Sequence, residues 1–395
     1  MKKKSVLLIL MLSISLLLSG CWSSHEVNTL GLTVAIGIDK VGDGYLISEQ
    51  LINPKAIASQ KATHESPAVV YTAEGANIAE AIKRLATMTP RKIYSSHLRM
   101  VILSEEIAKD GITDIVDYLL RFHEYRTDFF FAVAKGITAN EILMTLTPIE
   151  VVPGISMYDK VKMSSEEWAP TRATQIIELA NDIMADGINP IISSVELTEN
   201  EEKPTSTEVL AKIGGYEQLK FQALAAFRDD VFVGWLNERE SKGCNYITGA
   251  VKRTTGFASE NGVELSYEVV KVKTKKKAVI ENDTPRIDVK ISIKCGVIGV
   301  KGDMDVSKME NKETMSMMAE KKVTQLCRES VQKAQEDLKT DIFGFGELIH
   351  REDPDYWKTV KDNWNDAFPD IPVDIEVDVH ILSTGDMTKP ISQKE

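Results

Sequence analysis

Cysteine and histidine are scarce in this chain, which has four cysteines and six histidines in 395 residues. After Cys21 only Cys244, Cys295 and Cys327 remain, and their spacings match no metal-binding motif. Three thiols can form at most one intramolecular disulfide. The sequence therefore excludes a disulfide scaffold and suggests no metal site, and we interpret these thiols as small buried side chains.

Motifs for catalysis are also lacking. The sequence has no Gly-x-Ser-x-Gly elbow, no His-Glu-x-x-His pair and no phosphate loop ending in Gly-Lys-Ser/Thr. His123 precedes Glu124, and His350 precedes Glu352 by two residues, but such neighbours are usually solvated surface charges. His380 falls on the polar side of a predicted strand. We therefore predict no catalytic residue, no metal ion, no dissociable cofactor and no enzymatic activity.

Positive charge is in deficit, with 47 Lys and Arg against 59 Asp and Glu and a net charge of −12. Nucleic-acid binding needs a basic face, and anionic lipids attract basic segments. We therefore expect no nucleic-acid partner and no adhesion to a membrane through charge.

Long apolar runs are missing except at the start, where Val6 to Leu18 follows Lys2, Lys3 and Lys4. A helix over this run would be about 20 Å long, against a hydrocarbon core of roughly 30 Å. The pattern is typical of a secretory signal peptide, which we place at residues 1–20. No second span is expected.

The residues Leu18-Ser19-Gly20-Cys21 resemble the lipobox of bacterial lipoproteins. The resemblance implies that the Cys21 sulfur receives a diacylglyceryl group, that the chain is cut before Cys21, and that the new N-terminus is acylated. Two or more acyl chains hold a protein stably on a membrane where one does not. Residues 21–29 would then form the anchor and its linker.

The remaining chain has 43 % hydrophobic and 27 % charged residues, which is typical of globular protein. Strand and helix patterns alternate, and we predict an α+β fold of three domains, each a mostly antiparallel or mixed sheet with flanking helices. The predicted domains are residues 30–150, 151–255 and 256–395. The last should contain a long helix near 308–339 and an antiparallel sheet.

The clearest strand periodicity lies in Arg286–Lys294 and Val373–Ile381, where apolar and polar residues alternate. Such alternation predicts a sheet with one buried face. If the two strands are neighbours, the basic residues of the first would face the acidic residues of the second.

At this point the chain resembles the Ger(x)C family, the C-subunit lipoproteins of nutrient germinant receptors in bacterial spores. The resemblance covers nearly the whole chain. It rests on blocks that include Cys21-Trp22, Gly37-Ile38-Asp39, Ser96 to Val101, Arg121 with Glu124 and Arg126, Gly234-Trp235-Leu236, and Asp341 to Gly346 followed by His350, Pro354, Trp357 and Trp364.

The resemblance implies a non-enzymatic subunit on the outer face of the spore inner membrane, held there by lipid. It would act with an integral A subunit and a transporter-like B subunit, which are its expected partners. The nutrient is expected to contact the B subunit, so the resemblance places no nutrient pocket in this chain.

A different function class remains open, namely an extracytoplasmic lipoprotein that binds solutes for an importer. Such proteins usually have two similar doubly wound lobes, and the sequence shows no two matching halves. A cell-wall hydrolase would need a pair of acidic residues or a metal set that the sequence does not offer.

The segment Asp341-Ile-Phe-Gly-Phe-Gly346 follows the long predicted helix, and Gly344 and Gly346 could end that helix with positive φ. Two interpretations apply to its aromatic residues. Phe343, Phe345, Trp357 and Trp364 could fill the core of the third domain, which we favour. They could instead stay exposed as anchors for a membrane subunit.

Overall fold

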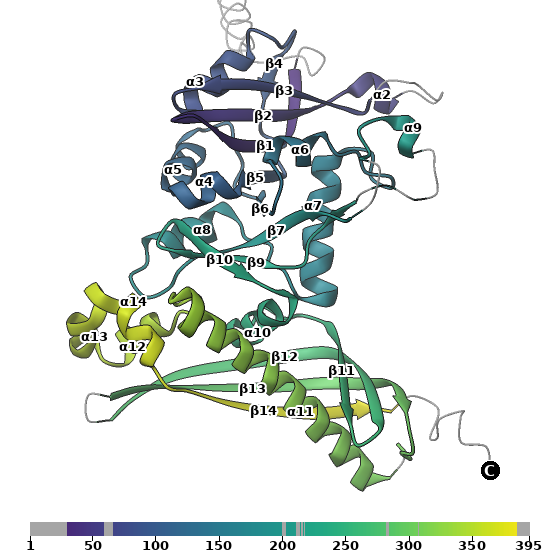
Figure 1. The fold of residues 1–395 in the computed structure, drawn as a ribbon, viewed down its shortest axis with the longest axis vertical. Helices are drawn as coiled ribbons and strands as arrows, with labels where there is room; N and C mark the ends of the chain where they lie inside the picture. Colours follow the sequence, from purple (N-terminus) through teal and green to yellow (C-terminus); the bar gives the residue numbers. More distant parts are fainter. Residues whose placement is uncertain are drawn as a thin grey trace, which may run out of the picture.

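The computed structural model describes residues 30–58, 66–199, 203–210, 214, 216, 218–281, 284–306 and 308–384. The predicted signal peptide, Cys21 and the predicted linker lie outside the described residues. Figure 1 shows two sheets, one above the other along the longest axis, with α10 (Glu238–Thr248) between them.

The upper sheet has ten described strands in the order β10-β9-β7-β6-β5-β1-β2-β3, with β4 beside β1 and β8 beside β7. The strands are β1 (Leu30–Val41), β2 (Gly44–Ile52), β3 (Ala68–Gly75), β4 (Lys92–Tyr94), β5 (Met100–Ser104), β6 (Phe130–Ala134), β7 (Ile191–Leu197), β8 (Leu219–Lys220), β9 (Leu224–Arg228) and β10 (Val231–Leu236).

The centre of this sheet is parallel, since β1, β5, β6 and β7 all run the same way. Every residue of β5 and β6 is buried, as expected for parallel strands that are covered on both faces. One apolar core lies on each face. The described helices around this sheet are α2 (Pro54–Ala58), α3 (Ile78–Leu85), α4 (Glu105–Asp110), α5 (Thr113–Arg121), α6 (Ala139–Met144), α7 (Pro153–Met163), η2 (Ser164–Trp168), α8 (Ile176–Met184) and α9 (Thr207–Leu210).

Local signals in the sequence place several of these elements. The Asn77 side chain caps α3, Thr138 and Glu141 form a capping box at the start of α6, and tight turns join β1 to β2 and β9 to β10 as antiparallel hairpins. The sheet nevertheless runs through residue 150, because β6 and β7 pair directly. The predicted division between residues 150 and 151 therefore does not separate two sheets.

The lower sheet has the order β11-β12-β13-β14, and its strands are β11 (Thr254–Glu260), β12 (Val263–Glu281), β13 (Thr284–Lys301) and β14 (Val373–Ser383). The prediction that Arg286–Lys294 and Val373–Ile381 are neighbours is confirmed, and Lys290 lies opposite Glu376 with 2.7 Å between Nζ and Oε2. The predicted antiparallel arrangement is wrong for this pair, because β14 runs parallel to β13. The long helix carries the chain back across the sheet and so allows that direction.

That helix is α11 (Met309–Gln332), which continues as the π-helical η3 (Lys333–Leu338) and lies across one face of the lower sheet (Figure 1). Its predicted apolar stripe is buried, from Met315 to Leu338. Beyond it the chain forms α12 (Phe345–Glu352), α13 (Pro354–Val360), η4 (Lys361–Asn363), α14 (Trp364–Ala367) and η5 (Phe368–Asp370). Cys244, Cys295 and Cys327 are free and buried, as predicted.

Helix α10 lies against α11 at a point where no side chain fits. A Cβ atom added to Gly243 would lie 2.1 Å from the backbone oxygen of Leu326. The α10–α11 crossing therefore requires glycine at this position, because that distance is far below van der Waals contact.

We predict that Gly243→Ala lowers the free energy of unfolding by about 1–3 kcal/mol, since overpacking forces the two helices apart. Urea unfolding followed by circular dichroism measures this loss. Gly299→Ala is the matched control, because its added Cβ would lie 3.7 Å from Ser266, which is ordinary contact. Equal effects of the two substitutions would contradict the assignment.

Candidate functional site

The residues that connect the two sheets form a site with several direct hydrogen bonds between distant segments. We call this site the joint and define it as residues 187–190, 227–230 and 338–347. The backbone N–H of Asn189 donates to the Asp341 carbonyl (2.7 Å), and the Thr340 hydroxyl donates to the Phe227 carbonyl (2.7 Å). The guanidinium of Arg228 donates to the carbonyls of Leu338 and Lys339, at 3.0 Å each. The end of the long helix is thereby fixed to the upper sheet.

Two glycines bring the backbones of the joint together. A Cβ on Gly346 would lie 2.7 Å from the Cα of Gly187, and a Cβ on Gly187 would lie 2.4 Å from the nitrogen of Glu347. That nitrogen donates to the Gly187 carbonyl. We call the upper sheet with its helices and the lower sheet with its helices the two lobes. At this point the lobes contact each other through backbone atoms alone, which only glycine allows at this distance.

The predicted role of the glycines as a helix stop needs correction. Lys339, at φ +49°, ends the long helix. Gly344 does take a positive φ of +72°, but it stands before the first turn of α12, and Gly346 lies inside α12. The long helix has therefore already ended before either glycine. Gly346 instead allows the close approach to Gly187, and Gly344 stands at the start of α12.

Asp341 is fully buried at the centre of the joint. Its Oδ1 accepts a hydrogen bond from the N–H of Phe343, and its Oδ2 accepts from the N–H of Gly346 (2.8 Å) and the indole of Trp364 (3.2 Å). Burial raises the pKa of this carboxyl to about 6, and these bonds and the nearby Lys276 oppose the rise. Lys276 on β12 donates to the Phe343 carbonyl, so the lower sheet is tied to the same loop.

The aromatic residues around Asp341 face inward. Phe343 and Phe345 are fully buried with ring centroids 5.0 Å apart, and Trp357 and Trp364 lie edge to face at 5.3 Å with 2 % and 3 % exposure. The favoured core interpretation fits this arrangement. The alternative, that these rings stay exposed as anchors for a partner, does not fit, because each ring is packed against Phe368 or against another member of the cluster.

Other blocks quoted for the family resemblance also have structural roles. Both carboxylate oxygens of Asp39 accept backbone N–H groups at the start of α6, from Ala139 (2.7 Å) and Asn140 (2.8 Å). Gly37 leaves room for that helix end. Arg99 pairs with Asp128 at 3.2 Å. Gly234 lies against Leu338 at the joint.

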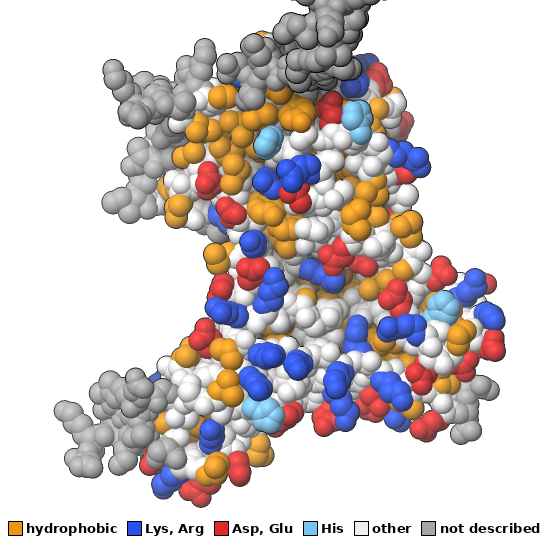
Figure 2. Space-filling model, turned by 180° about the vertical axis from the view of Figure 1, so that it is seen from behind, with side chains coloured by type: hydrophobic (Ala, Val, Ile, Leu, Met, Phe, Trp, Pro, Cys, Tyr) orange, Lys and Arg blue, Asp and Glu red, His pale blue; other side chains and the backbone are white. Residues whose placement is uncertain are grey.

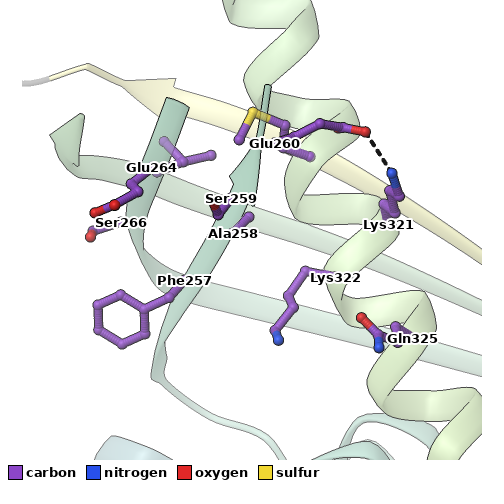
Figure 3. A pocket seen from close by; sticks show the side chains of 11 residues that line it. Phe257, Ala258, Ser259, Glu260, Glu264, Ser266, Lys321, Lys322 and Gln325 are labelled. Carbon is purple, nitrogen blue, oxygen red and sulfur yellow. Dashed lines mark hydrogen bonds and ion pairs between the residues drawn. The ribbon is translucent and has the colours of Figure 1, made fainter. Parts of the chain in front are cut away.

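Two clefts open near these elements. A polar cleft of about 420 Å³ beside the joint is lined by residues that include Asp186, Arg228, Asp229 and Asp362. A second cleft of about 440 Å³ lies between β11 and α11 (Figure 3). There Glu260 pairs with Lys321 at 2.5 Å, and neither histidine nor cysteine lines the walls. The walls of this cleft offer polar and apolar binding contacts.

Within the described residues, no group of three or more His, Cys, Asp or Glu side chains is placed to hold a metal ion. The same residues contain no helix long and apolar enough to cross a membrane. His123, His350 and His380 are not brought together by the fold; His380 is exposed on β14 with Asp378 at 2.9 Å, and His350 stacks on Trp357.

Sequence reasoning missed the joint itself. It did not pair Gly187 with Gly346, more than 150 residues later in the chain. The only local signal was the alternation of glycine and phenylalanine after Asp341. A close backbone contact between distant segments leaves no periodic pattern, so a single sequence does not reveal it.

Comparison with known families gives two matches in sequence order. The model described as "Spore germination protein N-terminal domain" matches residues 23–197, and the model described as "Spore germination B3/ GerAC like, C-terminal" matches residues 222–385. Together they span most of the chain.

Curated relatives from Bacillus subtilis (strain 168) match along their full length. The chain is 28 % identical to "Spore germination protein KC", covering 100 % of this chain and 99 % of the relative. It is 24 % identical to "Spore germination protein B3", covering 95 % and 96 %. Among solved structures, the crystal structure of the GerBC protein is similar with a TM-score of 0.56 at 20 % identity, covering 88 % of this chain and 96 % of that one. This likeness shows the same α+β fold.

We predict that Phe345→Ala lowers the free energy of unfolding by about 3–5 kcal/mol, because a large buried ring leaves a cavity. Phe257→Ala serves as control, since that ring is 54 % exposed and its loss should cost less than about 1 kcal/mol. Urea unfolding of both purified variants measures the difference. Unchanged stability of the Phe345 variant would place this ring outside the core.

A second prediction concerns pH. The ordinary pKa of an Asp is 3.8, and in the folded protein the pKa of Asp341 is about 6. Between these values the folded state binds more protons than the unfolded state, so this group makes stability fall as pH rises. Asn cannot ionise, and Asp341→Asn should remove that component, on the order of 1–3 kcal/mol.

Urea midpoints of the wild type and Asp341→Asn at pH 4.5 and pH 7 test this. The variant is less stable throughout because it loses acceptors, but its deficit should be smaller at pH 7. Glu49 and Asp182, whose pKa values burial raises to about 7 and about 6, contribute equally to both proteins and cancel in the difference. A deficit that grows with pH would refute the raised pKa.

Proposed function

Because this chain belongs to the Ger(x)C family of spore germination proteins, we propose that it is the C subunit of a nutrient germinant receptor. In this role it carries no catalytic activity. It acts by assembling with integral A and B membrane subunits, so that a small nutrient starts germination. The observation that carries the proposal is the end-to-end match to germination proteins, with 99 % of the relative named KC covered.

The position of the chain follows from its first residues. A lipid on Cys21, placed there by the lipobox Leu18-Ser19-Gly20-Cys21, would hold the protein on the outer face of the spore inner membrane. The first described strand starts at Leu30, so the anchor would lie within nine residues of β1. An extended segment of that length spans at most about 30 Å. The upper sheet would therefore lie close to the membrane and the lower sheet farther from it.

The buried joint supports a role in assembly over one in solute capture. Importer lipoproteins close two similar lobes around a ligand and need a hinge that moves. Here the lobes differ in strand number and order, and direct backbone hydrogen bonds and the Gly187–Gly346 contact join them. Such a joint favours a stiff scaffold on which partners dock.

Isothermal titration of the purified protein with amino acids and sugars distinguishes these functions. A receptor scaffold should give no heat of binding, while the integral A and B subunits should co-purify with it from spore membranes. Saturable nutrient binding without those subunits would favour the solute-binding alternative.

The anchor has its own test. Cys21→Ala should leave a folded protein that is lost from the spore membrane fraction, and germination through this receptor should fall. Ser23→Ala is the control, because it changes the same linker and spares the thiol. Membrane fractionation followed by immunoblotting measures the shift. Firm membrane retention of the Cys21→Ala protein would disprove lipid anchoring at this residue.

A further inference from the structure

The lower sheet has one face turned away from α11, which we call the outer face. Along β12 the described residues that point to this face between Lys271 and Lys277 are all exposed lysines, namely Lys271, Lys273, Lys275 and Lys277. None of the four forms an ion pair within the part of the chain that the structure describes. We call these residues the lysine row.

The lysine row is unfavourable for the sheet itself. Lys275 lies directly opposite Lys290 on β13, and Lys271 lies directly opposite Lys294. Like charges at opposed positions of an antiparallel pair destabilise it. Lysines scattered over a surface keep a protein soluble without placing like charges opposite each other. Solubility alone therefore does not explain why the lysine row lies beside Lys290 and Lys294.

The neighbouring carboxylates already have partners, and Asp288 on β13, which lies opposite Lys277, pairs with Arg286 at 2.9 Å. On β14 the acidic side chains Asp374, Glu376 and Asp378 face the same side, and each already has a partner on the sheet. Asp374 lies 3.4 Å from Arg286, Glu376 pairs with Lys290, and Asp378 contacts His380. The positive charge on β12 is left over after these pairs have formed.

Exposed apolar side chains stand on the adjacent strands of the same sheet. Val270, Ile298 and Leu382 are 45 %, 58 % and 56 % exposed, and they come from the adjacent strands β12, β13 and β14. Each stands where the strand register shifts: Val270 follows Val269, Ile298 follows Val297, and Leu382 follows Ile381, and none of the three has a paired residue opposite it among the described strands. Exposed apolar residues beside unpaired charge are typical of a docking surface with an apolar anchor and a polar rim.

Figure 2 shows basic side chains gathered across the lower part of the molecule on the face seen from behind. We propose that the outer face of the lower sheet is a docking surface for an acidic protein segment. Carboxylates of that segment pair with the lysine row, and an apolar side chain contacts Val270, Ile298 and Leu382. The proposal deepens the proposed function by naming the surface that an acidic extracytoplasmic segment of another receptor subunit would use.

Other occupants fit less well. A second copy of this chain could not offer the acidic row of β14 without giving up the pairs that this row already makes. The chain's own residues 385–395 carry Asp386 and Glu395 against Lys389 and Lys394, so they bring no excess of negative charge. An anionic bilayer would meet the acidic row as well, and the lower sheet lies at the opposite end of the molecule from β1 (Figure 1).

The test uses the full-length chain in nanodiscs of zwitterionic phosphatidylcholine. The probe is a fluorescent peptide of alternating glutamate and serine with one central leucine, titrated at 50 mM and 300 mM NaCl. We expect saturable binding that weakens at least tenfold at the higher salt concentration, since pairs between exposed charges are screened. Lys271→Gln, Lys273→Gln and Lys275→Gln combined should weaken binding at least tenfold at low salt.

The matched control combines Lys162→Gln, Lys308→Gln and Lys312→Gln, which makes the same change in net charge away from the outer face. Its binding should stay within twofold of the wild type. The lysine-row variant should also melt at the same temperature as the wild type or above it, because like-charge pairs are removed. A lower melting temperature would assign these lysines to the fold and overturn the proposal.

Three further outcomes would overturn it. Equal weakening by both triple variants would show only an effect of net charge. Binding of phosphatidylglycerol vesicles that requires the lysine row, without binding of the peptide, would assign the face to lipid. Self-association in light scattering that the lysine-row variant abolishes would assign it to a second copy. Because none of these measurements involves germination, failure of the proposed function would not be mistaken for failure of this surface.

Discussion

The contact between Gly187 and Gly346 sets the relation of the two lobes. At a Cβ-to-Cα distance of 2.7 Å no side chain fits, so the loop before β7 and the first turn of α12 touch through backbone alone. The hydrogen bonds from Asn189 to Asp341 and from Thr340 to Phe227 depend on that approach. Together they fix where the long helix ends, and with it the lower sheet on which α11 lies.

A buried carboxylate at this point needs its own explanation. Asp341 replaces its lost hydration with three N–H donors, two from the backbone and one from Trp364. Such a group is costly to bury unless every lone pair is used, and well-satisfied networks of this kind favour one geometry over its neighbours. The aromatic rings around it exclude water, which makes each of these bonds stronger. The aromatic cluster that sequence reasoning considered as a partner surface is therefore part of the buried core around Asp341.

The motif residues in the interior and the charged residues on the surface have different roles. Most motif residues that carry the family resemblance cap helices, pack at close backbone contacts or fill the core around the joint, and Asp39 at the start of α6 is a clear case. The lysine row on the outer face of the lower sheet serves no such purpose, and its Lys275 lies opposite another lysine, Lys290. Motif similarity thus marks how the scaffold is built, while the lysine row marks the surface that we propose for docking.

The sequence by itself determined the local elements. Alternation along Arg286–Lys294 and Val373–Ile381 identified two strands, and the sequence placed a long helix near residues 308–339, because each of these patterns depends on residues a few positions apart. Only the tertiary structure decided what depends on distant residues. It extended one sheet across residue 150, ran β14 parallel to β13, and turned Phe343 and Trp364 inward around Asp341. Strand order, strand direction and the burial of an aromatic ring are set by segments far apart in the chain, and no local pattern carries that information.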